Sequence, residues 1–283
     1  MNIQEVDYKS KYFPPLLRDI ASVPKKLYVR GQIPELPMIT VVGTRKPSDY
    51  GRQQTYRIAH DLAKAGFCIV SGLAYGLDAV AHKAALDAKG KTIAVLGNSI
   101  DSIYPAGNQK LGEQILEQGG AIISEYEPGL ATQKFNFPAR NRILAGISLG
   151  VIITEADAKS GTLITANFAL TNNRYVFAVP GNITSPRSAG PNNLIKHGAH
   201  AITDATDVLD LLGLQSGLLK KPTVKADSKE EAQILDILAE HSCSTAELID
   251  TTGLEAAQVA TILSLMEITG KIRSMGAGQW LAV

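Results

Sequence analysis

The chain has 283 residues, 45% hydrophobic and 19% charged, which is enough to bury a substantial core and to form more than one domain. It shows no basic region followed by an apolar run at its start and no apolar stretch of about 18 residues, so we expect a cytoplasmic protein without membrane insertion. Cys68 and Cys243 have no CxxC spacing, which argues against a disulfide framework or a cysteine metal site and predicts reduced core thiols.

The net charge of +1 is unevenly distributed. Residues 1–227 carry 25 Lys and Arg and 19 Asp and Glu, a net charge of +6, whereas residues 228–283 carry 3 and 8, a net charge of −5. If the protein binds nucleic acid, the first part is therefore the better candidate.

Residues 1–36 are expected to be an N-terminal extension that packs on the core. Six short apolar stretches follow, each ending in a loop of glycine, hydroxyl or basic residues, and they are predicted to be strands: Ile39–Val42, Phe67–Val70, Thr92–Leu96, Ala121–Ile123, Val151–Thr154 and Tyr175–Val179. Helical patterns lie between them at Arg52–Lys64, Ala79–Ala88, Gln109–Gln118, Ala139–Leu144 and Leu163–Leu170, and short helices are expected at Leu194–His197 and Asp207–Leu212.

This alternation of strands and helices is typical of βαβ units. Strands of four or five nearly continuous apolar residues suit a sheet that is covered on both faces. We therefore predict an α/β fold: an extended Rossmann-like, doubly wound, mostly parallel sheet over residues 37–214.

Residues 215–227 have the Gly, Lys and Pro content of a linker, and residues 228–283 predict a small winged-helix domain. Its elements are expected at Lys229–Ala239, Thr245–Asp250, Ala256–Ile268, Ile272–Met275 and Gln279–Val283. The would-be recognition helix, residues 255–269, contains no Lys or Arg, whereas major-groove readers need such side chains. We favour another role for it, with DNA reading as the alternative.

The loop after the first strand has the chemistry of a phosphate site. Gly43 permits close backbone approach, the Thr44 hydroxyl can donate and Arg45 can make a bidentate contact, while Ser48 or Asp49 is a suitable helix N-cap. The alternative is a tight turn with a solvated arginine. The loop is not GxGxxG, which disfavours a dinucleotide, and we expect no cofactor.

Small-residue loops also follow the other strands, among them Ser71–Asp78, which contains Gly72, and Ser160-Gly161-Thr162. Because the carboxyl ends of parallel strands share one edge, these loops should converge there. His82, one helical turn beyond Asp78, is expected to be a capping or packing histidine, since no nucleophile or metal ligand is spaced to use it.

The densest cluster of cationic and aromatic side chains is Lys134–Arg142. Pro138 suits a first helical turn, and an aromatic ring beside cations is what single-stranded nucleic acid needs. The alternatives are that Phe135 or Phe137 belongs to the core and that Arg140 or Arg142 pairs with Glu125, Glu127 or Glu155.

Several motifs, in this order, resemble the DNA-processing protein A family (DprA, also called Smf): Gly43–Arg45, Ser71–Asp78 with Ala81-His82, Thr92–Gly97, Tyr104-Pro105, Phe137–Arg142, Ser160–Thr165 and Val179–Gly181. The resemblance implies an extended Rossmann-fold homodimer that binds single-stranded DNA and loads the RecA recombinase onto it during natural transformation. It implies that Gly43, Thr44 and Arg45 form the phosphate-binding loop.

By the same resemblance, Lys134 is the basic residue, Phe137 the base-stacking residue, and Arg140, Asn141 and Arg142 form the arginine-asparagine-arginine motif. We take Ser48, Gly72, Lys110, Ser160 and Gly161 as further candidates for contact with DNA.

A nucleotide or nucleoside-monophosphate hydrolase on a related fold is the alternative function. Such phosphoribohydrolases carry a Pro-Gly-Gly-x-Gly-Thr loop followed by acidic residues. Here Lys159-Ser160-Gly161-Thr162 is followed by Leu163-Ile164-Thr165, which removes the acid. A P-loop is also absent from the sequence, so we expect a non-enzymatic DNA-binding protein.

Overall fold

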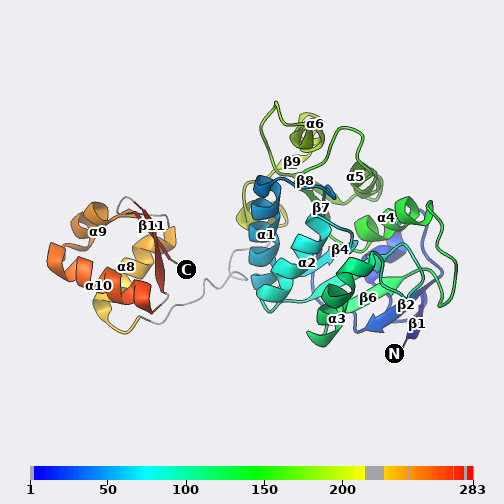
Figure 1. Ribbon diagram of the computed structural model, residues 1–283, viewed down its shortest axis with the longest axis horizontal. Helices are drawn as coiled ribbons and strands as arrows, with labels where there is room; N and C mark the ends of the chain where they lie inside the picture. Colours follow the sequence, from blue (N-terminus) through cyan, green and yellow to red (C-terminus); the bar gives the residue numbers. More distant parts are fainter. Residues whose placement is uncertain (1–2, 214–225, 241–242, 270, 277–278, 283) are drawn as a thin grey trace. The chain divides into compact units, whose positions relative to one another are not determined.

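The computed structural model describes residues 3–213, 226–240, 243–269, 271–276 and 279–282 (Figure 1). The chain divides into two compact units, Met1–Leu219 and Lys220–Val283. The predicted linker, residues 215–227, lies almost wholly outside the described residues. Within the described part, no helix is long and apolar enough to cross a membrane.

A nine-stranded sheet in the order β1-β2-β6-β5-β4-β3-β7-β8-β9 forms the centre of the first unit. Its strands are β1 (Gln4–Asp7), β2 (Lys26–Gly31), β3 (Met38–Val42), β4 (Cys68–Ser71), β5 (Thr92–Leu96), β6 (Ala121–Ser124), β7 (Gly150–Ile153), β8 (Tyr175–Ala178) and β9 (His200–Ala201). The strands from β6 to β9 pair in parallel, and the expected α/β fold is confirmed.

The N-terminal residues contribute strands to this sheet. β1 pairs with β2 and β2 with β6, both antiparallel, which the sequence analysis did not predict. The 3-10 helix η1 (Pro15–Asp19) lies between β1 and β2 in the chain. Phe13 and Leu17, both in this connecting segment, are fully buried. Burying each such side chain contributes about 1.5–3 kcal/mol, so residues before β3 are tied firmly to the core.

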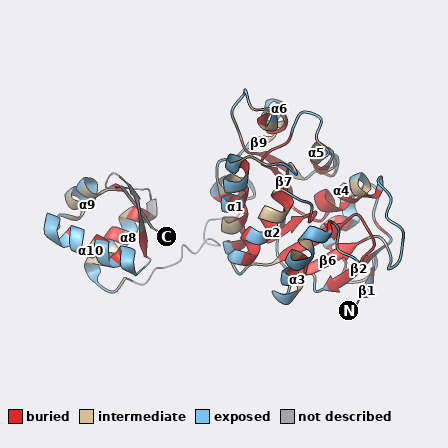
Figure 2. Ribbon diagram, viewed as in Figure 1, coloured by how far each residue is buried: buried red, intermediate tan, exposed pale blue. Residues whose placement is uncertain are grey.

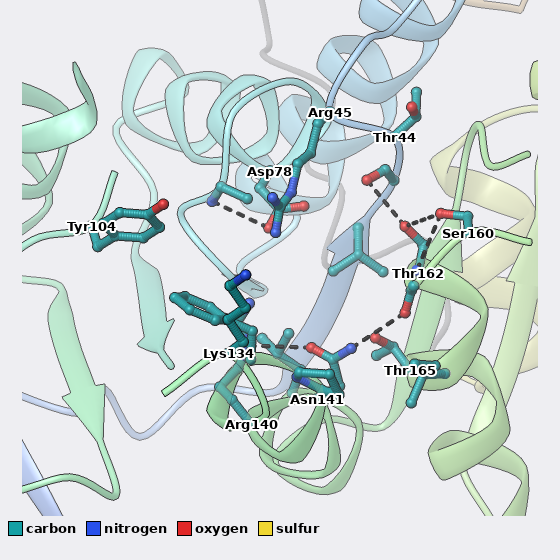
Figure 3. A pocket seen from close by; sticks show the side chains of 18 residues that line it. Thr44, Arg45, Asp78, Tyr104, Lys134, Arg140, Asn141, Ser160, Thr162 and Thr165 are labelled. Atoms are coloured by element: carbon teal, nitrogen blue, oxygen red, sulfur yellow. Dashed lines mark hydrogen bonds between the residues drawn. The ribbon is translucent and has the colours of Figure 1, made fainter. Parts of the chain in front are cut away.

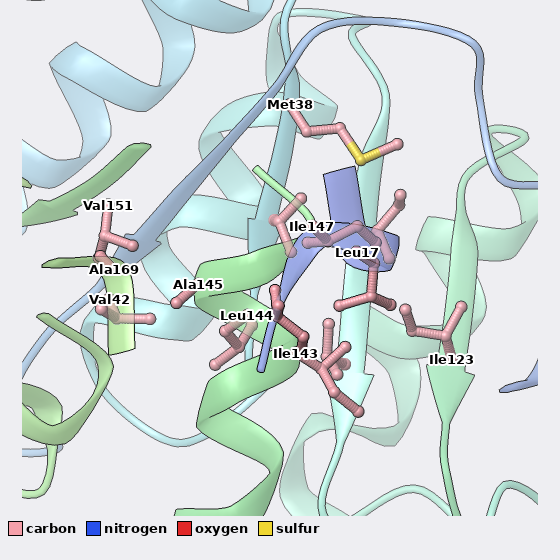
Figure 4. Close-up of a cluster of buried hydrophobic side chains, with 14 of the residues drawn as sticks. Leu17, Met38, Val42, Ile123, Ile143, Leu144, Ala145, Ile147, Val151 and Ala169 are labelled. Carbon is pink, nitrogen blue, oxygen red and sulfur yellow. The ribbon is translucent and has the colours of Figure 1, made fainter. Parts of the chain in front are cut away.

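Helices cover both faces of the sheet because the apolar side chains of its strands alternate. On β3, Ile39 and Val41 pack against α1 (Asp49–Lys64) and α2 (Leu77–Asp87), while Val42 packs against α4 (Asn136–Gly146) and α5 (Thr162–Thr171). Val42 belongs to a cluster of buried hydrophobic side chains that also includes Leu17 and the α4 residues Ile143 and Leu144 (Figure 4). The strands are buried, and the outer faces of the helices are exposed (Figure 2).

The other α-helices in the described part of this unit are α3 (Gln109–Glu117), α6 (Ala189–Lys196) and α7 (Ala205–Leu211). α3 packs on β5 and β6, and α7 packs beside α1. The two short closing helices predicted from the sequence correspond to α6 and α7.

The strand order reverses between β3 and β7. β3 leads through α1 to β4 on one side, whereas β7, its other neighbour, arrives after β6 and α4. A loop leaving β3 and a loop leaving β7 therefore diverge at the carboxyl edge. Such a switch point is where open α/β sheets bind ligands.

The second unit is built of α8 (Lys229–Glu240), α9 (Thr245–Thr252), α10 (Ala256–Ile268) and a sheet in the order β10-β12-β11. Its strands are β10 (Cys243–Ser244), β11 (Ile272–Gly276) and β12 (Gln279–Ala282). The predicted winged helix is confirmed, with the two-residue β10 in addition. Cys243 is buried in this core and Cys68 in that of the first unit, so the predicted burial of both thiols is confirmed.

Candidate nucleic-acid interface

A cavity of about 520 Å³ lies at the switch point, beyond the ends of β3 and β7. We call it the strand-end pocket (Figure 3). It collects nine of the thirteen predicted site residues: Gly43, Thr44, Arg45, Lys134, Phe137, Arg140, Asn141, Ser160 and Gly161. It also contains residues that were not predicted as site residues, notably Asp78, Tyr104, Thr162 and Thr165.

The loop after β3 is fixed by backbone contacts on both sides. The amide of Thr44 donates to the Glu155 carbonyl at 2.8 Å, and the Thr44 carbonyl accepts from the amide of Leu77 at 3.2 Å. A Cβ at Gly43 would lie 2.4 Å from a Leu77 methyl carbon and 3.0 Å from the Glu155 carbonyl oxygen, so a glycine is required here. The Arg45 side chain, in contrast, is exposed and free to meet a ligand.

Ser48 has a structural role outside the pocket. Its hydroxyl caps α1 by accepting from the Gly51 amide at 3.1 Å, as predicted for an N-cap, and it donates to the buried Glu155 carboxylate. The Ser48 amide donates to the same carboxylate at 2.9 Å. The Glu155 carboxylate therefore accepts hydrogen bonds from Ser48. It is not the partner of Arg140 or Arg142 that the sequence analysis gave as an alternative.

Arg140 lies under the pocket and is only 6% exposed. Its Nη1 donates to the carbonyl of Gly72 at 3.0 Å and to that of Val95. Burial lowers the pKa of this guanidinium to about 10, while Asp78 acts in the opposite direction. The side chain, predicted to contact phosphate, is instead engaged with backbone in the floor of the pocket.

Gly72 and Asp78 complete this floor. The Asp78 carboxylate accepts from the amides of Gly72 at 3.1 Å and Ala74 at 3.4 Å. Burial raises the pKa of Asp78, and the Arg140 charge counteracts that shift. A Cβ at Gly72 would lie 2.7 Å from both terminal guanidinium nitrogens of Arg140 and from Asp78 Oδ2, so this packing requires a glycine.

His82 is fully buried behind the floor, where its Nδ1 lies 2.7 Å from Thr92 Oγ1. Burial, assisted by the Arg140 charge, lowers the pKa of His82 to about 3. The imidazole is therefore neutral, and the expected packing role fits its place in the structure.

Two predicted cations lie outside the pocket. Arg142 makes a 2.6 Å ion pair with Glu125, with side chains 13% and 26% exposed, which is the alternative contact given for it; its contact with phosphate stays a prediction. Lys110 is exposed on the first turn of α3, away from the residues that line the pocket.

Hydroxyl and amide groups form one side of the pocket, at the start of α5. Thr162 Oγ1 donates to the Gly43 carbonyl at 3.1 Å, and the Thr162 amide donates to Ser160 Oγ at 3.2 Å. Asn141 Nδ2 reaches the Gly161 carbonyl at 3.3 Å, which connects α4 to this loop. These contacts hold polar groups opposite the exposed Arg45.

Aromatic rings form the other side. Phe137, in the first turn of α4, is half-buried, and its ring packs over Gly97, where a Cβ would lie 2.7 Å from a ring carbon. The Tyr104 ring is 55% exposed, with its centroid 5.4 Å from that of Phe137. Lys134 is exposed in the segment before α4, and Figure 3 shows it with Arg45 between Tyr104 and the Ser160 side of the pocket.

Exposed cations, small-residue loops and aromatic rings thus lie together at the switch point of an α/β sheet. The family model described as DNA recombination-mediator protein A matches residues 4–213, and that of the DprA winged helix domain matches residues 220–278. The chain therefore belongs to the DprA/Smf family of DNA-processing proteins.

Individual relatives agree with this assignment. Protein Smf of Escherichia coli is 37% identical over 95% of this chain and 75% of its own length. The X-ray structure of DNA processing protein A from Streptococcus pneumoniae is 40% identical, covers 74% of each chain and gives a TM-score of 0.70. A Helicobacter pylori DprA structure, described for its single-stranded DNA binding mode, is 34% identical over 75% of this chain and 96% of its own, with a TM-score of 0.67.

Proposed function

We propose that this protein binds single-stranded DNA in the strand-end pocket and loads the RecA recombinase onto it during DNA uptake, without catalysing a reaction itself. We further propose that it acts in the cytoplasm as a homodimer. One observation carries the DNA-binding part: two exposed cations and an accessible aromatic ring share one cavity.

The three side chains have complementary tasks. Arg45 and Lys134 are exposed and can neutralise phosphates, and each neutralised phosphate of a single strand strengthens the dependence of affinity on salt. The Phe137 ring offers a surface that every base can stack on, because every base has a π-face. A duplex keeps its bases stacked on one another, so this arrangement favours a single strand.

The state of Asp78 supports binding rather than hydrolysis. It is the one carboxylate among the described residues that line the pocket, and it is 5% exposed. Its hydrogen bonds from Gly72 and Ala74 and the nearby Arg140 charge engage it in the floor. A general acid or base must reach the reacting atoms, and the low exposure and backbone contacts of this carboxylate favour a structural role instead.

A gel-shift comparison tests the proposal, with single-stranded and duplex oligonucleotides of one sequence and a nucleotide-hydrolysis assay in parallel. We expect retention of the single strand, weaker retention of the duplex and no hydrolysis. RecA filament formation on the single strand should rise when the protein is added. Hydrolysis without single-strand binding would overturn the proposal in favour of the hydrolase alternative.

A further inference from the structure

We propose that Tyr104 is a second base-stacking residue, so that the strand-end pocket holds two consecutive bases, one on Phe137 and one on Tyr104. This inference rests on the proposed binding of single-stranded DNA and extends it to a residue outside the Lys134–Arg142 cluster. Tyr104 is 55% exposed and, unlike the exposed Tyr8 and Tyr12, lines the same pocket as Arg45 and Lys134.

The distance between the two rings determines how bases can be placed. Their centroids are 5.4 Å apart, whereas a base inserted between two rings needs about 7 Å, twice the ~3.4 Å rise per nucleotide. One base therefore does not fit between Tyr104 and Phe137. Each ring can instead offer an outward face to a base of its own.

The angle between the rings sets the path of the strand. The ring planes are inclined by 47°, so bases stacked on the two rings cannot stay parallel to each other. Two neighbouring nucleotides must be splayed apart, which a single strand permits and a duplex resists. The pair of rings would thus add to the preference for single-stranded DNA.

The segment that carries Tyr104 is held in place without a ligand. Asn108 Nδ2 donates to the carbonyls of Leu73 at 2.8 Å and Ala74 at 3.2 Å, which joins the segment after Tyr104 to the loop before α2. The Tyr75 ring packs over Gly107, where a Cβ would lie 2.8 Å from the Tyr75 hydroxyl. A ring on such a fixed support loses little freedom on binding, which favours affinity.

The charges of the pocket place a phosphate near both rings. Arg45 and Lys134 line the same cavity, and Figure 3 shows Tyr104 on the side away from Ser160 and Thr162. A backbone phosphate held by these cations has polar groups on one side and aromatic rings on the other. The strand would therefore leave the pocket over Tyr104.

Fluorescence anisotropy with a short labelled oligothymidylate and the full chain tests the inference. Tyr104→Ala should weaken binding about 5- to 150-fold, the range for one stacked base, while Tyr104→Phe keeps the ring and the wild-type affinity. Tyr8→Ala is the matched control, because Tyr8 is 42% exposed in the N-terminal segment, outside the strand-end pocket. Thermal melts of all variants show whether the fold is retained.

Two further measurements separate stacking from support of Phe137. The Tyr104→Ala/Phe137→Ala double variant should bind more weakly than either single variant, because two bases lose their rings. On an oligonucleotide with abasic sites in place of its bases, Tyr104→Ala should have no effect. A double variant no worse than Phe137→Ala, or a Tyr104→Ala loss that persists on the abasic strand, would overturn the inference.

The outcome also distinguishes this inference from the proposed function. Tyr104→Ala binding like wild type, with Phe137→Ala weakened, would overturn the second stacking residue and leave the proposed function standing. Failure of the wild-type chain to bind any single strand would overturn both.

Discussion

The Arg140 guanidinium donates to the Gly72 carbonyl at 3.0 Å, and a Cβ at Gly72 would lie 2.7 Å from both of its terminal nitrogens. The arginine-asparagine-arginine motif is thereby divided into three roles. Arg140 supports the pocket floor, Asn141 reaches the Gly161 carbonyl, and Arg142 pairs with Glu125. All three side chains thus have a structural contact of their own, and Arg140 and Asn141 also line the pocket.

Arg140→Ala should lower the free energy of unfolding by about 3–5 kcal/mol, because it removes the buried donor to the Gly72 and Val95 carbonyls and the positive charge near Asp78. Urea denaturation monitored by circular dichroism measures this. Arg142→Ala is the comparison, with a smaller expected loss of about 1–2 kcal/mol, since the side chains of its ion pair with Glu125 are 13% and 26% exposed and remain in reach of solvent. Equal losses in the two variants would contradict the assignment of Arg140 to the floor.

His82 should make the protein less stable in mild acid. Its pKa is about 3 in the folded chain and near 6.5 when unfolded, so below pH 6.5 the unfolded state binds a proton that the folded state does not. The stability that the neutral His82 contributes to the folded chain is fully present above pH 6.5 and is lost progressively as the pH falls toward 3. Between pH 7 and 5.5 the loss is about 1 kcal/mol.

Urea titrations of wild type and His82→Gln at these two pH values check this prediction. The variant should lose less stability than wild type over the same interval, because it lacks the titrating group. An equal pH dependence in both proteins would show that His82 does not titrate differently on unfolding.

The parallel strands could be predicted because they are short apolar runs followed by small-residue loops, as in Met38–Val42 with Gly43. β2, with the apolar run Leu27-Tyr28-Val29, was missed although it fits this pattern, whereas β1 could not be predicted in this way. Gln4–Asp7 has one buried apolar residue, Val6, and lies at the sheet edge, so its sequence carries no continuous apolar pattern. Its pairing with β2 depends on contacts between residues far apart in the chain.

The site was predictable in its loops but not in the burial of its charges. Spacing placed Arg45 and Lys134 at the carboxyl edge, where the structure has them exposed. Arginine is rarely buried, so the pattern around Arg140 indicated a surface cation, and only packing against Gly72 and Asp78 reveals a buried one. Tyr104 joins the site through the loop after β5; the Tyr104-Pro105 motif marked this position in the sequence but did not indicate that the ring lines the pocket.

A truncated protein ending at Leu219 should keep its affinity for single-stranded DNA. The second compact unit begins at Lys220, residues 228–283 carry a net charge of −5, and residues 255–269 contain no Lys or Arg, so this part is a poor match to a phosphate backbone. Anisotropy of the truncated and full chains measures the difference. A truncated protein that is folded by circular dichroism but has lost most of its affinity would make the second unit the DNA reader.

The salt dependence of single-strand binding tests the central claim most directly. In anisotropy titrations of oligothymidylate over a salt series, Arg45→Ala/Lys134→Ala should bind more weakly than wild type, and the slope of log affinity against log salt should fall by about 1.4, or ~0.7 for each lost phosphate contact. Lys64→Ala, at the far end of α1, should leave both quantities unchanged. Wild-type affinity and slope in the double variant would contradict the claim that DNA binds in the strand-end pocket.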